Sequence, residues 1–126
     1  MKANAAATEK GETMKIPNSV RIAGVEYGVI EHEQLDDGKS VLRGQIDFCS
    51  NQIALNIGIG LDYQRRCITL LHEILHGIWY NAGIDEQYDD AEEEIVGKLA
   101  KGLYMVLQDN GARLFDLREA ERRDDA

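Results

Sequence analysis

The chain has 126 residues and a formal net charge of −9, and its composition is 44% hydrophobic and 29% charged. This length and composition are typical of one folded domain with a single core, and they exclude a low-complexity chain. The negative charge would repel a phosphate backbone, so nucleic acid is not expected as a partner. No apolar run approaches the roughly 18 residues that span a bilayer, and the N-terminus lacks the apolar centre of a secretion signal. We therefore expect a cytoplasmic protein without a membrane partner.

Composition divides the chain into one domain and two tails. Residues 1–15 are rich in Ala, Glu, Lys and Thr without a sustained period, so we expect a flexible tail. The domain is expected from residue 16 to residue 112. Residues 113–126 end in a charged run and are predicted to form a tail or a short exposed helix. Cys49 and Cys67 belong to no motif, and in a reducing compartment we expect two buried free thiols.

Alternating apolar residues in the first half of the domain predict two β-hairpins. The strands are expected at residues 20–22, 25–29, 44–49 and 52–57, with turns at Ala23-Gly24 and Ser50-Asn51. Between the hairpins, the polar stretch from Glu31 to Ser40 contains the turn signal DDG and is interpreted as a loop or an irregular crossover. One face of each strand should be buried.

Helical spacing of apolar residues begins after Gly60. The first helix is predicted from Leu61 to about Asn81, with Asp62 as its N-cap and Gly83 as its stop. Its apolar side contains Cys67, Leu71, Ile74, Leu75, Ile78 and Trp79. The second helix is predicted from about Asp90 to Gln108, and its buried side should contain Ile95, Val96, Leu99, Ala100, Leu103, Val106 and Leu107. The fold class is thus α+β, with two helices packed on one side of a small antiparallel sheet.

The first helix carries the sequence His72-Glu73-Ile74-Leu75-His76. Residues i and i+4 of a helix differ by about 40° in direction and about 6 Å in height, so both imidazoles can reach one Zn²⁺. Glu73 points about 100° away from His72 and can act as general base on a metal-activated water. Both histidines lie at the margin of the apolar side, where a ligand beside a cleft should lie.

A catalytic zinc site usually has three protein ligands, and no histidine follows His76. The run Glu92-Glu93-Glu94 at the start of the second helix supplies carboxylates. Glu94 lies on the polar side of that helix, where Lys98 is its i,i+4 salt-bridge partner. Glu92 and Glu93 lie towards the apolar side. Helical phase favours Glu93, at the edge of that side, and leaves Glu92 as a close alternative.

These segments resemble the gluzincin-type metallopeptidases, and more narrowly the small phage and bacterial proteins related to the ImmA/IrrE family. The similarity covers residues 20–110, through the strand pair GQIDFCSNQIALNI, the zinc-binding segment TLLHEILHGI and the helix EEEIVGKLAKGLYMVLQDN. The resemblance implies a minimal zincin-like fold and endopeptidase activity with bound zinc. From the spacing of Glu93 to Val96 and to Leu99-Ala100, it also implies Glu93 as the glutamate ligand. By the same resemblance, an edge strand at residues 52–57 would bind an extended peptide by β-augmentation, and the alternative is an ordinary core strand.

The leading functional hypothesis is a zinc-dependent endopeptidase that acts on a protein or peptide substrate. The first alternative is a non-catalytic zinc-binding regulatory or phage accessory module that binds a protein partner. The second is a structural protein without a metal. Amide hydrolysis also needs a group that stabilises the oxyanion. The sequence offers four candidates without choosing among them, namely His32, Tyr80, Tyr88 and Tyr104.

Overall fold

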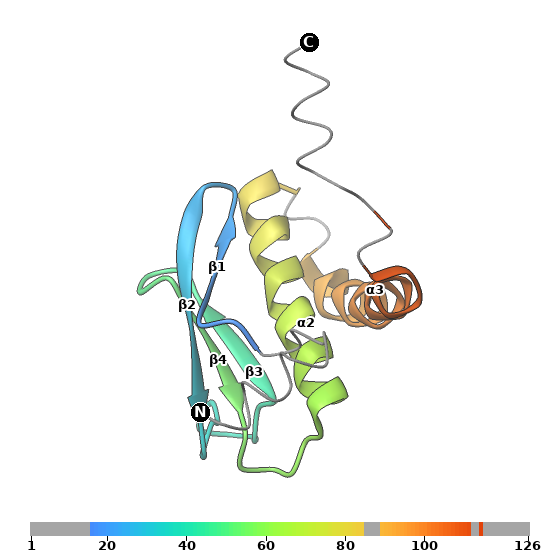
Figure 1. Cartoon of the computed structure of the whole chain (residues 1–126). Helices are drawn as coiled ribbons and strands as arrows, with labels where there is room; N and C mark the ends of the chain where they lie inside the picture. Colours follow the sequence, from blue (N-terminus) through green and yellow to red (C-terminus); the bar gives the residue numbers. More distant parts are fainter. Residues whose placement is uncertain (1–15, 85–88, 112–113, 115–126) are drawn as a thin grey trace.

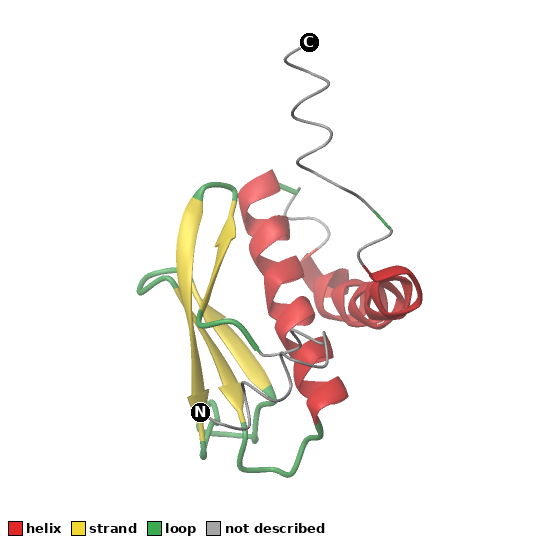
Figure 2. Cartoon of the chain, in the orientation of Figure 1, coloured by secondary structure: helices red, strands yellow, loops and turns green. Residues whose placement is uncertain are grey.

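Four strands and then two helices follow one another along the chain. A computed structural model describes residues 16–84, 89–111 and 114, so the tail expected at 1–15 and nearly all of that expected at 113–126 lie outside the described residues. The elements are β1 (Ser19–Ile22), β2 (Val25–His32), β3 (Gly44–Asp47), β4 (Gln52–Asn56), α2 (Tyr63–Ala82) and α3 (Asp89–Asn110). The predicted α+β class, both hairpins and both helices are confirmed (Figure 1, Figure 2). Neither described helix combines the length and the apolar character that a membrane crossing requires.

The strands form one mixed sheet in the order β1-β2-β4-β3. Each hairpin is antiparallel, but β2 and β4 run parallel, with Gly28 opposite Gln52 and His32 opposite Asn56. The sheet is therefore not wholly antiparallel as expected, because the segment after β2 carries the chain to the outer position and β4 then enters between β2 and β3. The strand at residues 52–57 is consequently an interior strand, and the edge strand next to it is β3.

Asn56 joins the end of β4 to the segment that precedes β3. Its Nδ2 donates to the carbonyl oxygen of Leu42 at 2.8 Å, and its Oδ1 accepts from the backbone N–H of Gly58 at 2.8 Å. Its backbone N–H donates to the carbonyl oxygen of Arg43, also at 2.8 Å. The Asn56 side chain is almost fully buried, where an amide without hydrogen bonds would be costly. These bonds give residues 41–43 a defined place beside β3.

Helix α2 covers one face of the sheet (Figure 1). As predicted, Asp62 is its N-cap, accepting from the backbone N–H of Arg65 at 2.8 Å, and Gly83 is its C-cap with a φ of 68°. The side chain of Leu70 joins the core formed by Ile22, Tyr27, Ile53 and Leu55. A Cβ atom at position 77 would lie 2.8 Å from Cδ1 of Ile22, so glycine allows this close packing.

The buried side of α2 differs from the prediction. It consists of Thr69, Leu70, Glu73 and Gly77, whereas Ile78 is exposed and Ile74 is only partly buried against the core. The reason is that α2 lies between the sheet and α3, so its buried side is set by these two neighbours and not by its apolar residues alone.

Helix α3 packs on α2 and on none of the described strands, so it forms a third layer instead of covering the sheet (Figure 2). Of its predicted buried side, only Val96 and Ala100 are buried, with 1% and 0% exposure, while Leu99 is 55% exposed. The other four predicted positions are also exposed, namely Ile95, Leu103, Val106 and Leu107. A helix that rests on a single other helix covers only a narrow strip, which leaves the wider apolar side uncovered.

The cysteines are both free, as predicted, but they are not both buried. Cys67 is half-buried in α2, and Cys49 is exposed. Cys49 lies in the turn of the second hairpin because β3 ends at Asp47, whose Oδ1 accepts from the backbone N–H of Cys49 at 2.8 Å. This turn is longer than the predicted Ser50-Asn51 pair, and it places the thiol outside the sheet.

Candidate metal centre

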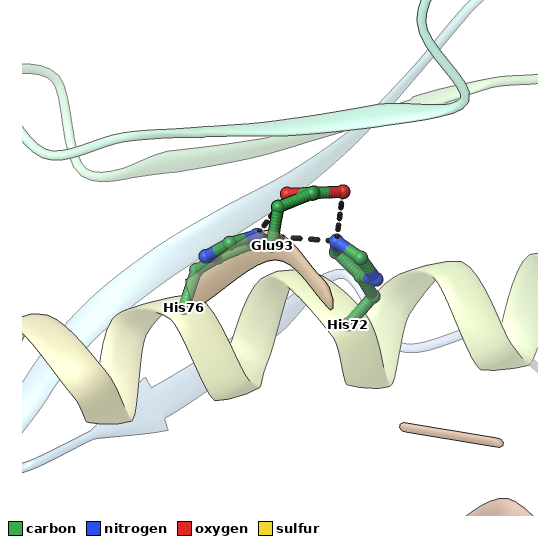
Figure 3. A group of neighbouring side chains, drawn as sticks. All are labelled: His72, His76 and Glu93. Atoms are coloured by element: carbon green, nitrogen blue, oxygen red, sulfur yellow. Dashed lines mark hydrogen bonds and ion pairs between the residues drawn. The ribbon is translucent and has the colours of Figure 1, made fainter. Parts of the chain in front are cut away.

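His72 and His76 project from the same side of α2, one turn apart (Figure 3). Their ring centroids are 4.8 Å apart, and the two Nε2 atoms approach to 3.1 Å. Both side chains are mostly buried. The two imidazoles therefore face the same small volume, as the i,i+4 spacing predicts.

Glu93 reaches this volume from the first turns of α3. Its Oε2 lies 3.0 Å from Nε2 of His72, and its Oε1 lies 2.9 Å from Nε2 of His76 (Figure 3). The Glu93 side chain is 76% exposed, so it closes the site from the solvent side. One ligand atom from each of the three residues lies within 4.8 Å of the others. The tertiary structure thus brings together the three residues that the sequence analysis selected as ligands.

Glu92 occupies a different position from Glu93. Its Oε2 lies 2.6 Å from Nδ1 of His76, on the side of the ring opposite Nε2. Glu94 points elsewhere and pairs with Lys98 at 3.2 Å, which confirms the predicted i,i+4 pair. The three consecutive glutamates therefore have three separate partners, and only Glu93 faces both Nε2 atoms.

The arrangement of acceptors at this cluster favours a positive charge between them. Nδ1 of His76 donates to the Glu92 carboxylate, so Nε2 of a neutral His76 ring carries a lone pair. That lone pair would face both the Glu93 carboxylate at 2.9 Å and Nε2 of His72 at 3.1 Å. Acceptors at such distances repel each other unless a proton or a cation lies between them.

The pKa values of the two rings are shifted in opposite directions. Burial works against a charged His76 ring, but its hydrogen bond with Glu92 and the charges of Glu73 and Glu93 more than offset burial, so the pKa of His76 is raised. Burial dominates at His72 and lowers the pKa of that ring. In the metal-free protein, the His76 ring therefore holds its proton more tightly than the His72 ring.

The donor set fits zinc. Three ligand atoms that each lie about 2.0 to 2.1 Å from a tetrahedral Zn²⁺ are roughly 3.3 Å apart. The two Nε2 atoms are 3.1 Å apart here, and each lies 2.9 or 3.0 Å from a different oxygen of Glu93. With one ligand atom taken from each residue, all three lie within 4.8 Å of one another, so small movements of these side chains would accommodate the ion. Two imidazoles and one carboxylate would leave a fourth position for water or substrate.

Glu73 lies beside this cluster on the sheet-facing side of α2. It is only 6% exposed, and burial together with the Glu93 charge raises the pKa of its carboxyl to about 7 despite the opposing charge of His76. A Cβ atom at position 44 would lie 3.2 Å from Oε2 of Glu73, so the glycine of β3 leaves room above the carboxyl group. Glu73 therefore faces the space between α2 and the edge strand.

Two cavities meet at the cluster, and His72, Glu73 and Glu93 line both of them. The first has a volume of about 480 Å³ and is also lined by Val41, Leu42, Arg43, Gly44, Ile68, Thr69, Glu94, Gly97, Lys98 and Lys101. The second has a volume of about 380 Å³ and is also lined by Leu42, Gly44, Gln45, Ile46, Phe48, His76 and Glu92. Together they form a groove along β3, with α2 as its floor and α3 as its far wall.

Part of this groove was not predicted from the sequence. Arg43 and Lys101 received no role, and no local pattern marks them, because they come from segments far apart in sequence. None of the described oxyanion candidates, His32, Tyr80 and Tyr104, lines either cavity. Tyr88 lies outside the described residues.

Comparison of the chain with protein-family models, with curated proteins and with solved structures gives no match. The chemistry of the site therefore has to be inferred from its own residues.

Proposed function

We propose that this protein is a zinc-dependent endopeptidase of the gluzincin type, similar to the ImmA/IrrE-related proteins, in which His72, His76 and Glu93 hold the metal. The observation that carries the proposal is the convergence of two Nε2 atoms on one carboxylate, beside a buried Glu73 and at the meeting point of two cavities. A structural helix gains nothing from three acceptors that face one another, whereas a metal site requires them.

In the proposed reaction, Glu73 accepts a proton from the attacking water and delivers it to the leaving amine. A bound Zn²⁺ would supply a Lewis acid that polarises the scissile carbonyl and lowers the pKa of water. Glu92 keeps Nδ1 of His76 engaged, so that Nε2 of that ring points to the metal position. Partial burial of the two imidazoles limits competition from bulk water.

The substrate would bind along β3. This strand is at the edge of the sheet, and the cavities on both sides of Glu73 border residues 41–46. An extended peptide can add to such an edge through main-chain hydrogen bonds. We therefore assign the β-augmentation to β3 and not to residues 52–57, which lie inside the sheet. The free thiols suit a reducing compartment, and a cytoplasmic location is part of the proposal.

Metal content and turnover test this proposal separately. Full-length protein loaded with zinc should contain one equivalent of metal by mass spectrometry and should hydrolyse casein. His72→Ala, His76→Ala and Glu93→Gln should lose zinc, whereas Glu94→Gln, which changes the neighbouring exposed carboxylate, should keep it.

The substitution Glu73→Gln separates the endopeptidase from the non-catalytic zinc-binding module. It should abolish turnover while leaving the zinc content nearly unchanged, because this carboxyl group lies beside the three ligand atoms and is not one of them. Unchanged hydrolysis in Glu73→Gln would contradict the proposed mechanism. Stoichiometric zinc without hydrolysis by the wild-type protein would favour the module.

A further inference from the structure

Three cationic side chains line the first cavity, although the chain carries a net charge of −9. Arg43 comes from the segment that precedes β3, and Lys98 and Lys101 come from successive turns of α3. They therefore approach the same space from the two opposite walls of the groove. The position of Arg43 is fixed by the hydrogen bond from the backbone N–H of Asn56 to its carbonyl oxygen.

Apart from Glu73, the acidic side chains that line this cavity are already engaged. Lys98 is paired with Glu94 at 3.2 Å, and the Glu93 carboxylate is directed at the two histidine rings. Within the described part of the chain, Arg43 and Lys101 make no ion pair. Once the ligands and the Lys98 pair are accounted for, two positive charges remain at the cavity wall to meet a substrate.

The second cavity has a different character. Its described lining includes no lysine or arginine. Beyond the three proposed ligands it consists of the apolar Leu42, Ile46 and Phe48 together with Gly44, Gln45, Glu73 and Glu92. The Phe48 ring stacks on that of Tyr80, with centroids 4.0 Å apart. The groove is thus cationic at its Arg43 end and apolar at its Phe48 end, with Glu73 between them.

We propose that this groove selects peptides with an acidic side chain on the C-terminal side of the scissile bond. The inference rests on the proposed function, because the position of Glu73 defines where the bond is cut. A peptide that pairs antiparallel with β3 runs from the Phe48 end to the Arg43 end, and antiparallel pairing is the more stable per residue. Its residues after the scissile bond then enter the cationic cavity, where Arg43 and Lys101 bind a carboxylate.

Cleavage-site profiling tests the preference directly. Zinc-loaded, full-length protein is incubated with a peptide mixture derived from a proteome, and the cleaved bonds are identified by mass spectrometry. Asp and Glu should be enriched C-terminal to the cleaved bond, and Arg43→Gln and Lys101→Gln should each reduce this enrichment about fivefold. Lys39→Gln, which removes an exposed cation that lines neither cavity, should leave it unchanged. Cleavage without acidic enrichment, or enrichment only on the N-terminal side, would overturn the inference.

A binding measurement distinguishes failure of this inference from failure of the proposed function. The zinc-loaded Glu73→Gln variant is titrated with alanine-based peptides that differ only in carrying Glu, Gln or Lys, each with amidated and with free C-termini. The amidated Glu peptide should bind at least about fivefold more tightly than the Gln peptide, and Arg43→Gln and Lys101→Gln should each reduce the difference.

Equal binding of the amidated Glu and Gln peptides would contradict the side-chain preference, even if a free C-terminal carboxylate bound well. If the Glu peptide binds preferentially but the wild-type protein cleaves nothing, the peptidase proposal fails while the charge selection stands. Cleavage without a charge preference gives the opposite conclusion.

Discussion

Nδ1 of His76 lies 2.6 Å from Oε2 of Glu92, while Nε2 of the same ring lies 2.9 Å from Oε1 of Glu93. Two consecutive glutamates of α3 thus contact the two nitrogens of one imidazole. An outer carboxylate of this kind sets the tautomer of a metal-binding histidine and increases its basicity. We therefore expect Glu93 to bind the metal and Glu92 to orient the His76 ring.

We expect Glu92→Gln to weaken zinc binding by about 10- to 100-fold without abolishing it. The amide oxygen can still accept from Nδ1, but the negative charge that favours the cationic site is lost. Competition with a chromophoric zinc chelator measures the affinity, and Glu94→Gln serves as a control with the same chemical change at an exposed neighbour. Equal affinities of Glu92→Gln and wild type would show that the Glu92 carboxylate does not support the metal position.

Zinc affinity should fall as the pH falls. The pKa of His76 is raised, so in the metal-free protein this ring holds its proton to a higher pH than an ordinary histidine, and zinc has to displace that proton. Below the pKa, the apparent affinity should decrease about tenfold for each unit of pH. Calorimetric titrations between about pH 5 and about pH 8 measure this dependence.

The charge of Glu73 contributes to the raised pKa of His76, so Glu73→Gln should shift the loss of affinity to lower pH. An affinity that stays constant across the range would mean that no histidine proton is displaced by the metal.

Removing the carboxyl group of Glu73 should stabilise the metal-free protein at neutral and alkaline pH. Burial raises the pKa of Glu73 to about 7 from an ordinary value of 4.5, so the folded state binds this proton more tightly than the unfolded state. The free energy of unfolding should therefore decrease as the pH rises from 4.5 to 7. Above pH 7 the ionised Glu73 should lower it by roughly 3 kcal/mol in total.

Urea unfolding of metal-free wild type and Glu73→Gln measures this difference. The variant should be more stable at pH values above 7, and the two proteins should converge below 4.5, where both states of the wild type are protonated. Addition of zinc should reduce the difference, because a nearby cation stabilises the carboxylate. A wild-type protein that is the more stable one at alkaline pH without metal would contradict the buried position of Glu73.

Two glycines within the helices should respond oppositely to alanine. At Gly77 the new Cβ would lie 2.8 Å from Cδ1 of Ile22 and 3.3 Å from Cδ1 of Ile46, so Gly77→Ala should destabilise the fold by about 1 to 3 kcal/mol. At Gly97 it would lie 3.7 Å from Cε1 of His72, an ordinary contact. Gly97→Ala should therefore be neutral or stabilising, because alanine favours a helix by about 1 kcal/mol over glycine. Thermal unfolding of both variants measures the contrast, and equal effects would show that α2 is not packed this closely on β1.

Local features of the sequence were sufficient for much of this protein. The caps Asp62 and Gly83 directly precede and follow α2 in the sequence. The bounds predicted for this helix agree with the structure to within two residues at each end. The convergence of His72 and His76 follows from the pitch of a single helix. The turn at Ala23-Gly24 likewise depends only on the φ angles of 53° and 83° that these residues adopt.

Only the tertiary structure decided which strands are neighbours, which side of each helix is buried and what the three glutamates contact. The insertion of β4 between β2 and β3 depends on pairing between distant segments, and periodicity carries no information about it. Leu99 and Ala100 both belong to the buried side predicted for α3, yet Ala100 is buried and Leu99 is exposed. Glu92 and Glu93 differ by one residue in sequence, and the crossing of α3 over α2 determines which of them faces both imidazoles, because a helix spaces its own side chains but cannot specify its partner's position.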